Sequence, residues 1–135
     1  MKKVLISGLI CGALLLILSF AVLYLTINLF PALAEEYYNP VFWPGNDRAL
    51  LYFLHPFVLS IALAWVWHRF KSILTGNWII RGLEFGFIYL LIGTIPSMWL
   101  TFSAINVSFS MVFSWVIYGL LQAAICGLIF SKLNP

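Results

Sequence analysis

Four long hydrophobic runs, separated by short polar segments, set the pattern of this chain. The runs cover residues 4–30, 49–70, 78–102 and 108–131, and the charged residues lie at or near their ends. Each run has the roughly 20 residues that an α-helix needs to cross about 30 Å of hydrocarbon. The pattern predicts an all-α integral membrane protein, a four-helix bundle. Its single transmembrane domain covers residues 1–135, with residues 31–48 as its one long loop.

Small residues recur at helical spacing within three of these runs. Such stripes let two membrane helices approach closely, as in the GxxxG motif. The stripe of the first run continues from two glycines to Ser19 and Thr26, and that of the third continues to Ser97. We therefore predict helix-packing positions at Gly8, Gly12, Gly82, Gly86, Gly93, Gly119, Ala123 and Gly127. Pro56 and Pro96 lie in the opposite halves of their runs, where Pro96 predicts a kink. A bundle packed tightly at one end and splayed at the other is expected.

The first and third runs resemble each other under a shift of 74 positions. Gly8 and Gly12 then coincide with Gly82 and Gly86. One reading is a parallel pair of helical hairpins, as in transporters with internal repeats. The second and fourth runs show no such match, and coincidence between two apolar helices also explains the resemblance.

The segments between the runs carry turn and capping residues. Residues 32–38 predict a short helix at the membrane surface, ended by Asn39 and Pro40. Pro44-Gly45 predicts a turn, and Asp47 and Asn77 are expected to cap the helices that follow them.

Composition and charge place the chain in a membrane and orient it there. Hydrophobic residues make up 64% and charged residues 8% of the chain, whereas soluble domains average about 25% charged. Arg48 lies on one side of the four runs, and six basic residues lie on the other: Lys2, Lys3, Arg69, Lys71, Arg81 and Lys132. This bias predicts cytoplasmic N and C termini in a multi-pass protein of the cell (inner) membrane. The net charge of +3 does not indicate nucleic-acid binding, because the basic residues lie at the ends of the runs.

The first run could be mistaken for a signal peptide, because Ala32-Leu33-Ala34 resembles a cleavage site. Its 27 uncharged residues exceed the roughly 7–15 residues of the hydrophobic region in a signal peptide. We therefore expect an uncleaved first span.

His55 is the main candidate for chemistry, because an ionisable group inside a membrane span indicates a functional site by default. Other polar side chains lie at comparable depth, and together they predict a pocket open to the outside. The candidate pocket residues are Asn28, Arg48, Tyr52, His55, Thr94, Ser97 and Ser114. The plainer alternative is that His55 hydrogen-bonds a neighbouring hydroxyl or backbone carbonyl. Axial ligation of a haem or pigment has weaker support, since His68 lies too far along the helix to be a second ligand.

The remaining reactive side chains favour structural roles. Cys11 and Cys126 lack CxxC spacing, so we expect two small buried residues at a helix contact. Glu84 is expected to pair with Arg81, and Gln122 to form an interhelical hydrogen bond. No catalytic set can be placed at one depth, so we expect no enzyme activity, no cofactor and no metal.

Several short motifs resemble a group of small uncharacterised four-span membrane proteins of prokaryotes. These are RGLEFG at 81–86, IP at 95–96, VFSWVIYGLLQ at 112–122 and YNP at 38–40. The resemblance implies a four-span fold and brings no activity with it.

Two functional hypotheses follow. The first is a protein that acts through helix packing among membrane lipids, as an accessory subunit of a larger membrane complex or as a homo-oligomer. The alternative is a small transporter or channel with an outward-open polar pocket around His55.

Overall fold

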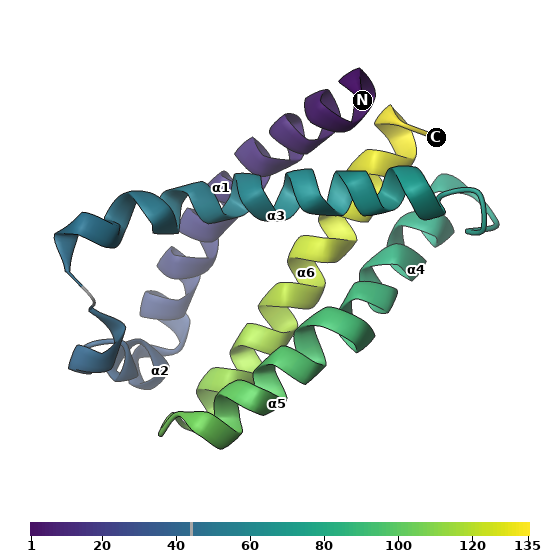
Figure 1. Ribbon diagram of the computed structural model, residues 1–135. Helices are drawn as coiled ribbons and strands as arrows, with labels where there is room; N and C mark the ends of the chain where they lie inside the picture. Colours follow the sequence, from purple (N-terminus) through teal and green to yellow (C-terminus); the bar gives the residue numbers. More distant parts are fainter. Residues whose placement is uncertain (44) are drawn as a thin grey trace.

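The computed structural model describes residues 1–43 and 45–135, and its long segments are all helical (Figure 1). The helices are α1 (Lys2–Leu29), α2 (Pro31–Glu36), α3 (Ala49–Phe70), α4 (Trp78–Tyr89), α5 (Ile95–Ala104) and α6 (Phe109–Leu133). Within this described part there is no β-strand. Four segments are long and apolar enough to cross a membrane: Lys2–Leu29, Asn46–Phe70, Trp78–Ala104 and Phe109–Leu133. The prediction of an all-α chain with four membrane-length helices is confirmed.

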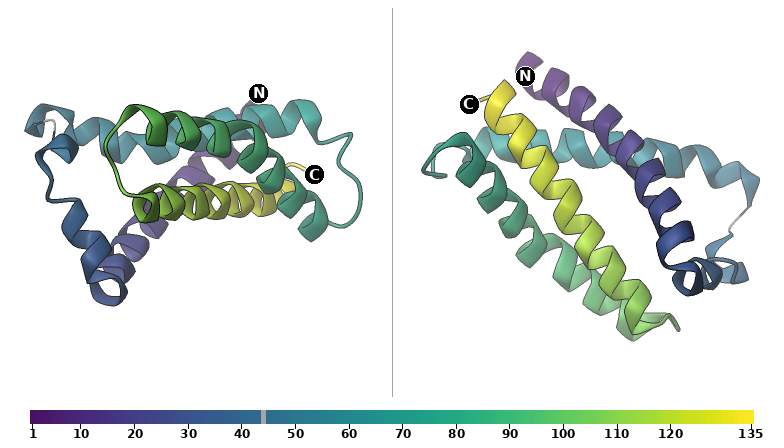
Figure 2. Two further views of the ribbon diagram at one scale, coloured as in Figure 1. Left: turned by 90° about the horizontal axis from the view of Figure 1, so that it is seen from below. Right: turned by 180° about the vertical axis from the view of Figure 1, so that it is seen from behind.

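The helices form two pairs whose shapes differ. Both termini lie at one end of the molecule, and α2 lies at the opposite end (Figures 1 and 2). α6 runs beside α4 and α5 along their length, whereas α1 and α3 cross and then diverge toward the end where α2 lies (Figure 2). The divergence leaves room between α1, α3 and α6 at that end.

Two glycines seat α1 on α3. A Cβ on Gly8 would lie 3.0 Å from the Cα of Ile61, and one on Gly12 would lie 3.0 Å from the Cα of Phe57. Ser60 lies between these contacts and donates a hydrogen bond from Oγ to the carbonyl oxygen of Gly8, at 2.8 Å. Only residues without a side chain allow this approach of two backbones.

The second pair, α4 and α6, uses glycines in the same way. A Cβ on Gly82 would lie 2.7 Å from the backbone nitrogen of Leu128, and one on Gly86 would lie 2.7 Å from the Cα of Ala124. Gly127 faces the carbonyl oxygen of Gly82 directly. No side chain fits at this contact without moving a helix.

The two pairs share one packing register. Ile61 and Leu128 are 67 positions apart, as are Phe57 and Ala124, and the glycines that contact them are 74 positions apart. The glycine contacts of the two pairs therefore share a register, although the sequences of the second and fourth runs show no resemblance.

Pro96 changes the helical geometry of the third span. A π-helical turn covers Leu90–Thr94 between α4 and α5, and the N–H of Ile95 donates to the carbonyl oxygen of Leu90, five residues back. Pro96 has no N–H to offer to the preceding turn. The expected irregularity takes the form of this widened turn, a form that π-bulges often take.

The buried core lies toward the end that carries the termini. Trp67, Phe85 and Phe130 form an aromatic cluster there, with ring centroids 5.4 to 6.4 Å apart. Trp67 also donates from Nε1 to the backbone oxygen of Asn134, at 2.9 Å. This cluster joins α3, α4 and α6, so the two helix pairs are fixed to each other at this end.

Some of the local predictions hold and others do not. Asn77 caps α4, accepting bonds from the N–H groups of Ile79 and Ile80 at 3.0 Å. Asp47 does not cap α3, because it lies inside a 3-10 turn, Asn46–Arg48, that runs directly into the helix. Gly45 has the positive φ of 118° that a turn requires, and Pro44 lies outside the described residues.

The predicted pairing of Arg81 with Glu84 is wrong. The guanidinium of Arg81 lies over the Trp67 ring, 5.4 Å from its centroid, and Nη2 donates to the backbone oxygen of Lys71 at 3.1 Å. Glu84 is exposed, and no ion pair joins it to another residue in the part of the chain that the structure describes. Arg81 therefore joins two helices and does not pair with a residue of its own helix.

Candidate functional site: an uncharged pocket between α1, α3 and α6

A pocket of about 830 Å³ occupies the space where α1 and α3 diverge. Pockets that bind small molecules are usually about 300–1,000 Å³ in volume. Its α1 wall consists of Ser19, Val22, Leu23, Thr26 and Ile27, with Leu33 and Ala34 of α2 beyond them. Among the described residues, those that line the pocket include no Asp, Glu, Lys or Arg. The pocket lining is therefore mostly apolar and holds no carboxylate, ammonium or guanidinium group.

The α3 wall of the pocket is built around a proline. Tyr52, His55 and Pro56 line it, and Pro56 lies inside a continuous helix. Because Pro56 has no N–H, the carbonyl oxygen of Tyr52 loses its α-helical partner. The His55 side chain is exposed at this wall, and no hydrogen bond joins it to any residue in the described part of the chain. The structure thus gives no support to a purely internal hydrogen bond for His55.

The α6 wall contributes Ser114, Trp115, Tyr118 and Gln122. Gln122 is only 5% exposed, and its side chain lies near the Tyr118 hydroxyl. Ser114 donates to the backbone oxygen of Met111 at 2.6 Å. A carboxamide offers two donor hydrogens and an acceptor oxygen with two lone pairs. A contact with Tyr118 therefore leaves Gln122 with hydrogen-bonding capacity for a molecule bound in the pocket.

Aromatic side chains line the end of the pocket that is nearest to α2. Tyr37, Phe42 and Trp115 contact one another with ring centroids 5.4 to 6.5 Å apart. Trp115 donates from Nε1 to the Tyr37 hydroxyl at 2.6 Å, which ties the residues after α2 to α6. Desolvation raises the pKa of the Tyr37 phenol above its ordinary value of 10.0, and the hydrogen bond from Trp115 lowers it in part. Tyr37 consequently stays neutral at physiological pH.

The structure brings three of the seven predicted pocket residues together, namely Tyr52, His55 and Ser114. The other four lie elsewhere. Asn28 is exposed and donates to the backbone oxygen of Tyr24, and Ser97 donates to that of Gly93, each at 2.7 Å. Thr94 is buried against Gly119, at the contact between the third span and α6. Arg48 is exposed at the start of α3.

Several pocket residues were not identified from the sequence. Ser19 and Thr26 continue the small-residue stripe that seats α1 on α3, so that stripe could have placed them on the inward face. Gln122 was assigned to an interhelical hydrogen bond, but it faces the pocket instead. The aromatic residues of 37–42 gave no signal, because their position depends on how the long loop folds back.

The predicted packing residues mostly contact other helices of the same chain. Gly119 faces the side chain of Thr94, and Ala123 is fully buried in the core. Gly93 is the exception, because a Cβ there would meet only the ring of Tyr89 on the preceding turn.

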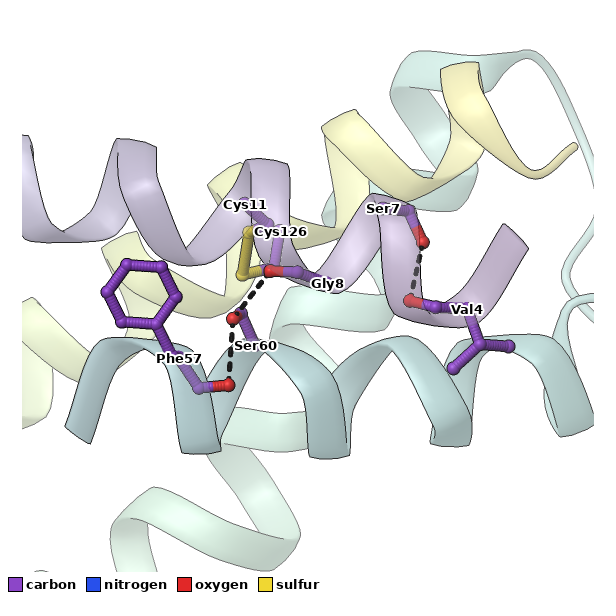
Figure 3. The surroundings of a disulfide bond; sticks show 7 residues. All are labelled: Val4, Ser7, Gly8, Cys11, Phe57, Ser60 and Cys126. Carbon is purple, nitrogen blue, oxygen red and sulfur yellow. Dashed lines mark hydrogen bonds between the residues drawn. A yellow bond between two sulfur atoms is a disulfide. The ribbon is translucent and has the colours of Figure 1, made fainter. Parts of the chain in front are cut away.

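Cys11 of α1 and Cys126 of α6 form a disulfide (Figure 3). Both residues are fully buried, as expected, and their Cα atoms are 5.9 Å apart. The pairing itself was not predicted, since the residues are 115 positions apart. It joins the two helix pairs next to the contact between Ser60 and Gly8 (Figure 3).

A second hollow, of about 250 Å³, lies between the α2 region and the start of α6 and includes Glu35, Glu36, Asn106 and Ser108. Within the described part of the chain, no group of three or more His, Cys, Asp or Glu could hold a metal ion. The larger pocket is therefore the candidate site.

Comparisons of the chain with protein-family models, with curated proteins and with solved structures found no match. The function is therefore inferred from the geometry and chemistry of this pocket.

Proposed function

We propose that this chain is a small membrane carrier that binds an uncharged amphipathic molecule in the pocket between α1, α3 and α6. The observation that carries the proposal is a mostly apolar pocket of about 830 Å³ whose lining includes hydrogen-bonding side chains, His55 of α3 and Gln122 of α6 among them. A molecule with a hydrogen-bonding head and an apolar body satisfies both features. This is the transporter hypothesis raised by His55, restricted to uncharged cargo.

The absence of charge in the lining favours neutral cargo. Phosphate-bearing lipids are usually held by Lys or Arg, and metabolite anions by Arg. The pocket residues offer hydroxyls, one imidazole and one carboxamide instead. Such groups recognise carbonyl and hydroxyl oxygens.

The unequal distribution of Lys and Arg between the two ends of the helices supports an orientation of the pocket toward the outer face of the membrane. With six Lys or Arg on the side of the termini, that side is the cytoplasmic one in our proposal. The pocket then opens in the outer half of the cell membrane, where α2 and the aromatic residues of 37–43 meet the headgroups.

A role as an accessory subunit that docks through glycine stripes is the weaker candidate. Gly8, Gly12, Gly82, Gly86 and Gly127 contact α3, α6 or α4 of the same chain. These positions are consequently not free to seat a partner helix. An assembly through other faces remains a prediction of the sequence.

Extraction of the protein in mild detergent tests the proposal. We expect an uncharged lipid to co-purify at about one molecule per chain, measured by native mass spectrometry. The bound fraction should fall at least about fivefold in His55→Ala and in Gln122→Leu, because each loses a hydrogen-bonding group. Ser97→Ala is the matched control, since Ser97 lies outside the pocket and bonds its own helix. Unchanged occupancy in both pocket variants, or no bound lipid in the wild type, would overturn the proposal.

A further inference from the structure

The pocket contains more aromatic surface than binding an acyl chain requires. Six aromatic side chains line it: Tyr37, Tyr38, Phe42, Tyr52, Trp115 and Tyr118. Three of them, Tyr37, Phe42 and Trp115, are fixed to one another by ring contacts and a hydrogen bond. Aromatic rings prefer to pack against other rings, in stacked or edge-to-face arrangements. A wall of this composition favours a ring in the ligand.

Two of the hydrogen-bonding groups in the pocket, His55 and Gln122, occupy corresponding positions relative to the glycine contacts of the two helix pairs. His55 lies two residues before Phe57, which contacts Gly12, and Gln122 lies two residues before Ala124, which contacts Gly86. Both face the same pocket, from α3 and from α6. The imidazole and the carboxamide can each donate a hydrogen bond. A ligand that offers oxygens on two sides can therefore be held from both helices.

The α1 wall provides a path for an apolar tail. Val22, Leu23 and Ile27 line the pocket, and Leu23 and Ile27 are 52% and 54% exposed on a helix that crosses the membrane. A chain that leaves the pocket along Leu23 and Ile27 would pass from this wall into lipid without meeting a charged lining residue.

We propose that the ligand is a flat, uncharged ring that carries oxygens on two sides and an apolar tail, the chemistry of a prenylated quinone or quinol. The ring lies among Tyr52, Tyr118 and Trp115, its oxygens accept from His55 and Gln122, and its tail runs along α1. This inference rests on the proposed function, because it specifies the cargo of the same pocket.

The test compares two uncharged lipids on the purified full chain in detergent. Decylbenzoquinone presents the ring, and dioctanoylglycerol presents hydroxyl and ester oxygens without a ring. Dissociation constants follow from the ligand-dependent rise in melting temperature. We expect the quinone to bind at least about tenfold more tightly than the diacylglycerol, and Gln122→Leu to weaken its binding about fivefold to tenfold.

A pair of substitutions at one position separates stacking from hydrogen bonding. Tyr118→Phe keeps the ring and should bind the quinone within about twofold of the wild type. Tyr118→Leu removes the ring and should weaken quinone binding about fivefold, while changing diacylglycerol binding less.

The possible outcomes distinguish failure of the quinone inference from failure of the proposed function. Equal or tighter binding of dioctanoylglycerol that depends on Gln122 would overturn the quinone inference and leave the proposed function standing. Binding of neither lipid to a folded wild type would overturn both.

Discussion

Gly86 of α4 packs directly against the backbone of α6, where Ala124 occupies the space that a Cβ atom on residue 86 would need. A Cβ there would lie 2.7 Å from the Cα of Ala124 and 2.8 Å from its backbone nitrogen. Backbone atoms in a packed helix cannot move aside alone, so α4 and α6 would have to separate. Gly93, in the same span, is different, because a Cβ there would meet only the outer edge of the Tyr89 ring, at 2.9 Å.

This contrast gives a prediction for stability. Gly86→Ala should lower the free energy of unfolding by about 1–3 kcal/mol, the usual cost of overpacking. Gly93→Ala is the matched control and should change it by no more than about 0.5 kcal/mol, because the tyrosine ring can rotate. Denaturant unfolding in detergent, followed by circular dichroism, measures both. Equal destabilisation by the two substitutions would contradict a backbone contact at Gly86.

Single residues were the hardest to predict from sequence where their role depends on a partner helix. His55 was identified because an ionisable group in an apolar run is visible without any knowledge of packing. Gln122 is equally polar, but its place in the pocket depends on how α6 packs beside α1 and α3, which the sequence does not show. The disulfide was not predicted for the same reason. The sequence pattern places Cys11 and Cys126 in apolar runs, but it does not show that α1 lies beside α6.

At the scale of elements, α1 is held to α6 by that disulfide, and α1 otherwise packs mainly on α3 through Gly8 and Gly12. The disulfide closes a long segment of chain and is out of contact with solvent. Long closed loops restrict the unfolded chain most, and native disulfides typically contribute about 2–4 kcal/mol.

Reduction should therefore lower the stability of the wild type by about 2–4 kcal/mol. The double variant Cys11→Ala/Cys126→Ala should unfold at that lower stability with or without reductant, which controls for effects of the reductant on other groups. Maleimide labelling under denaturing conditions counts the free thiols. We expect no label on the unreduced wild type, and two labels per unreduced chain would refute the disulfide.

The helices themselves were predictable because in lipid each backbone polar group must be satisfied within its own segment. An apolar run long enough to span the membrane then forms an α-helix. The four runs correspond to α1, α3, the α4–α5 span and α6. The loop after α1 has no such constraint. A short helix was predicted over residues 32–38, ended by Asn39 and Pro40, and α2 covers Pro31–Glu36. The contact of Tyr37, just after α2, with Trp115 was not predicted, because it joins residues far apart in the chain.

At the scale of the whole molecule, the two helix pairs are fixed together at one end, and α1 and α3 diverge toward the other, open end (Figure 2). The fixed end holds the Trp67–Phe85–Phe130 cluster and the disulfide, and the open end holds the pocket. A binding site at the open end can accommodate a guest without disturbing the core. The sequence pattern of glycines in one half and prolines in the other indicated this difference, although it did not show which helices separate.

The side of the membrane on which each end lies can be tested by thiol labelling in intact cells. Tyr38, near α2, is 86% exposed, and Ile73, between α3 and α4, is 69% exposed. A membrane-impermeant maleimide should label Tyr38→Cys in intact cells but label Ile73→Cys only after lysis, because the excess of Lys and Arg at the end with the termini predicts that this end is cytoplasmic. The wild type, whose two cysteines are paired, is the unlabelled control. Labelling of Ile73→Cys in intact cells would reverse the orientation, and the pocket would then open toward the inner leaflet.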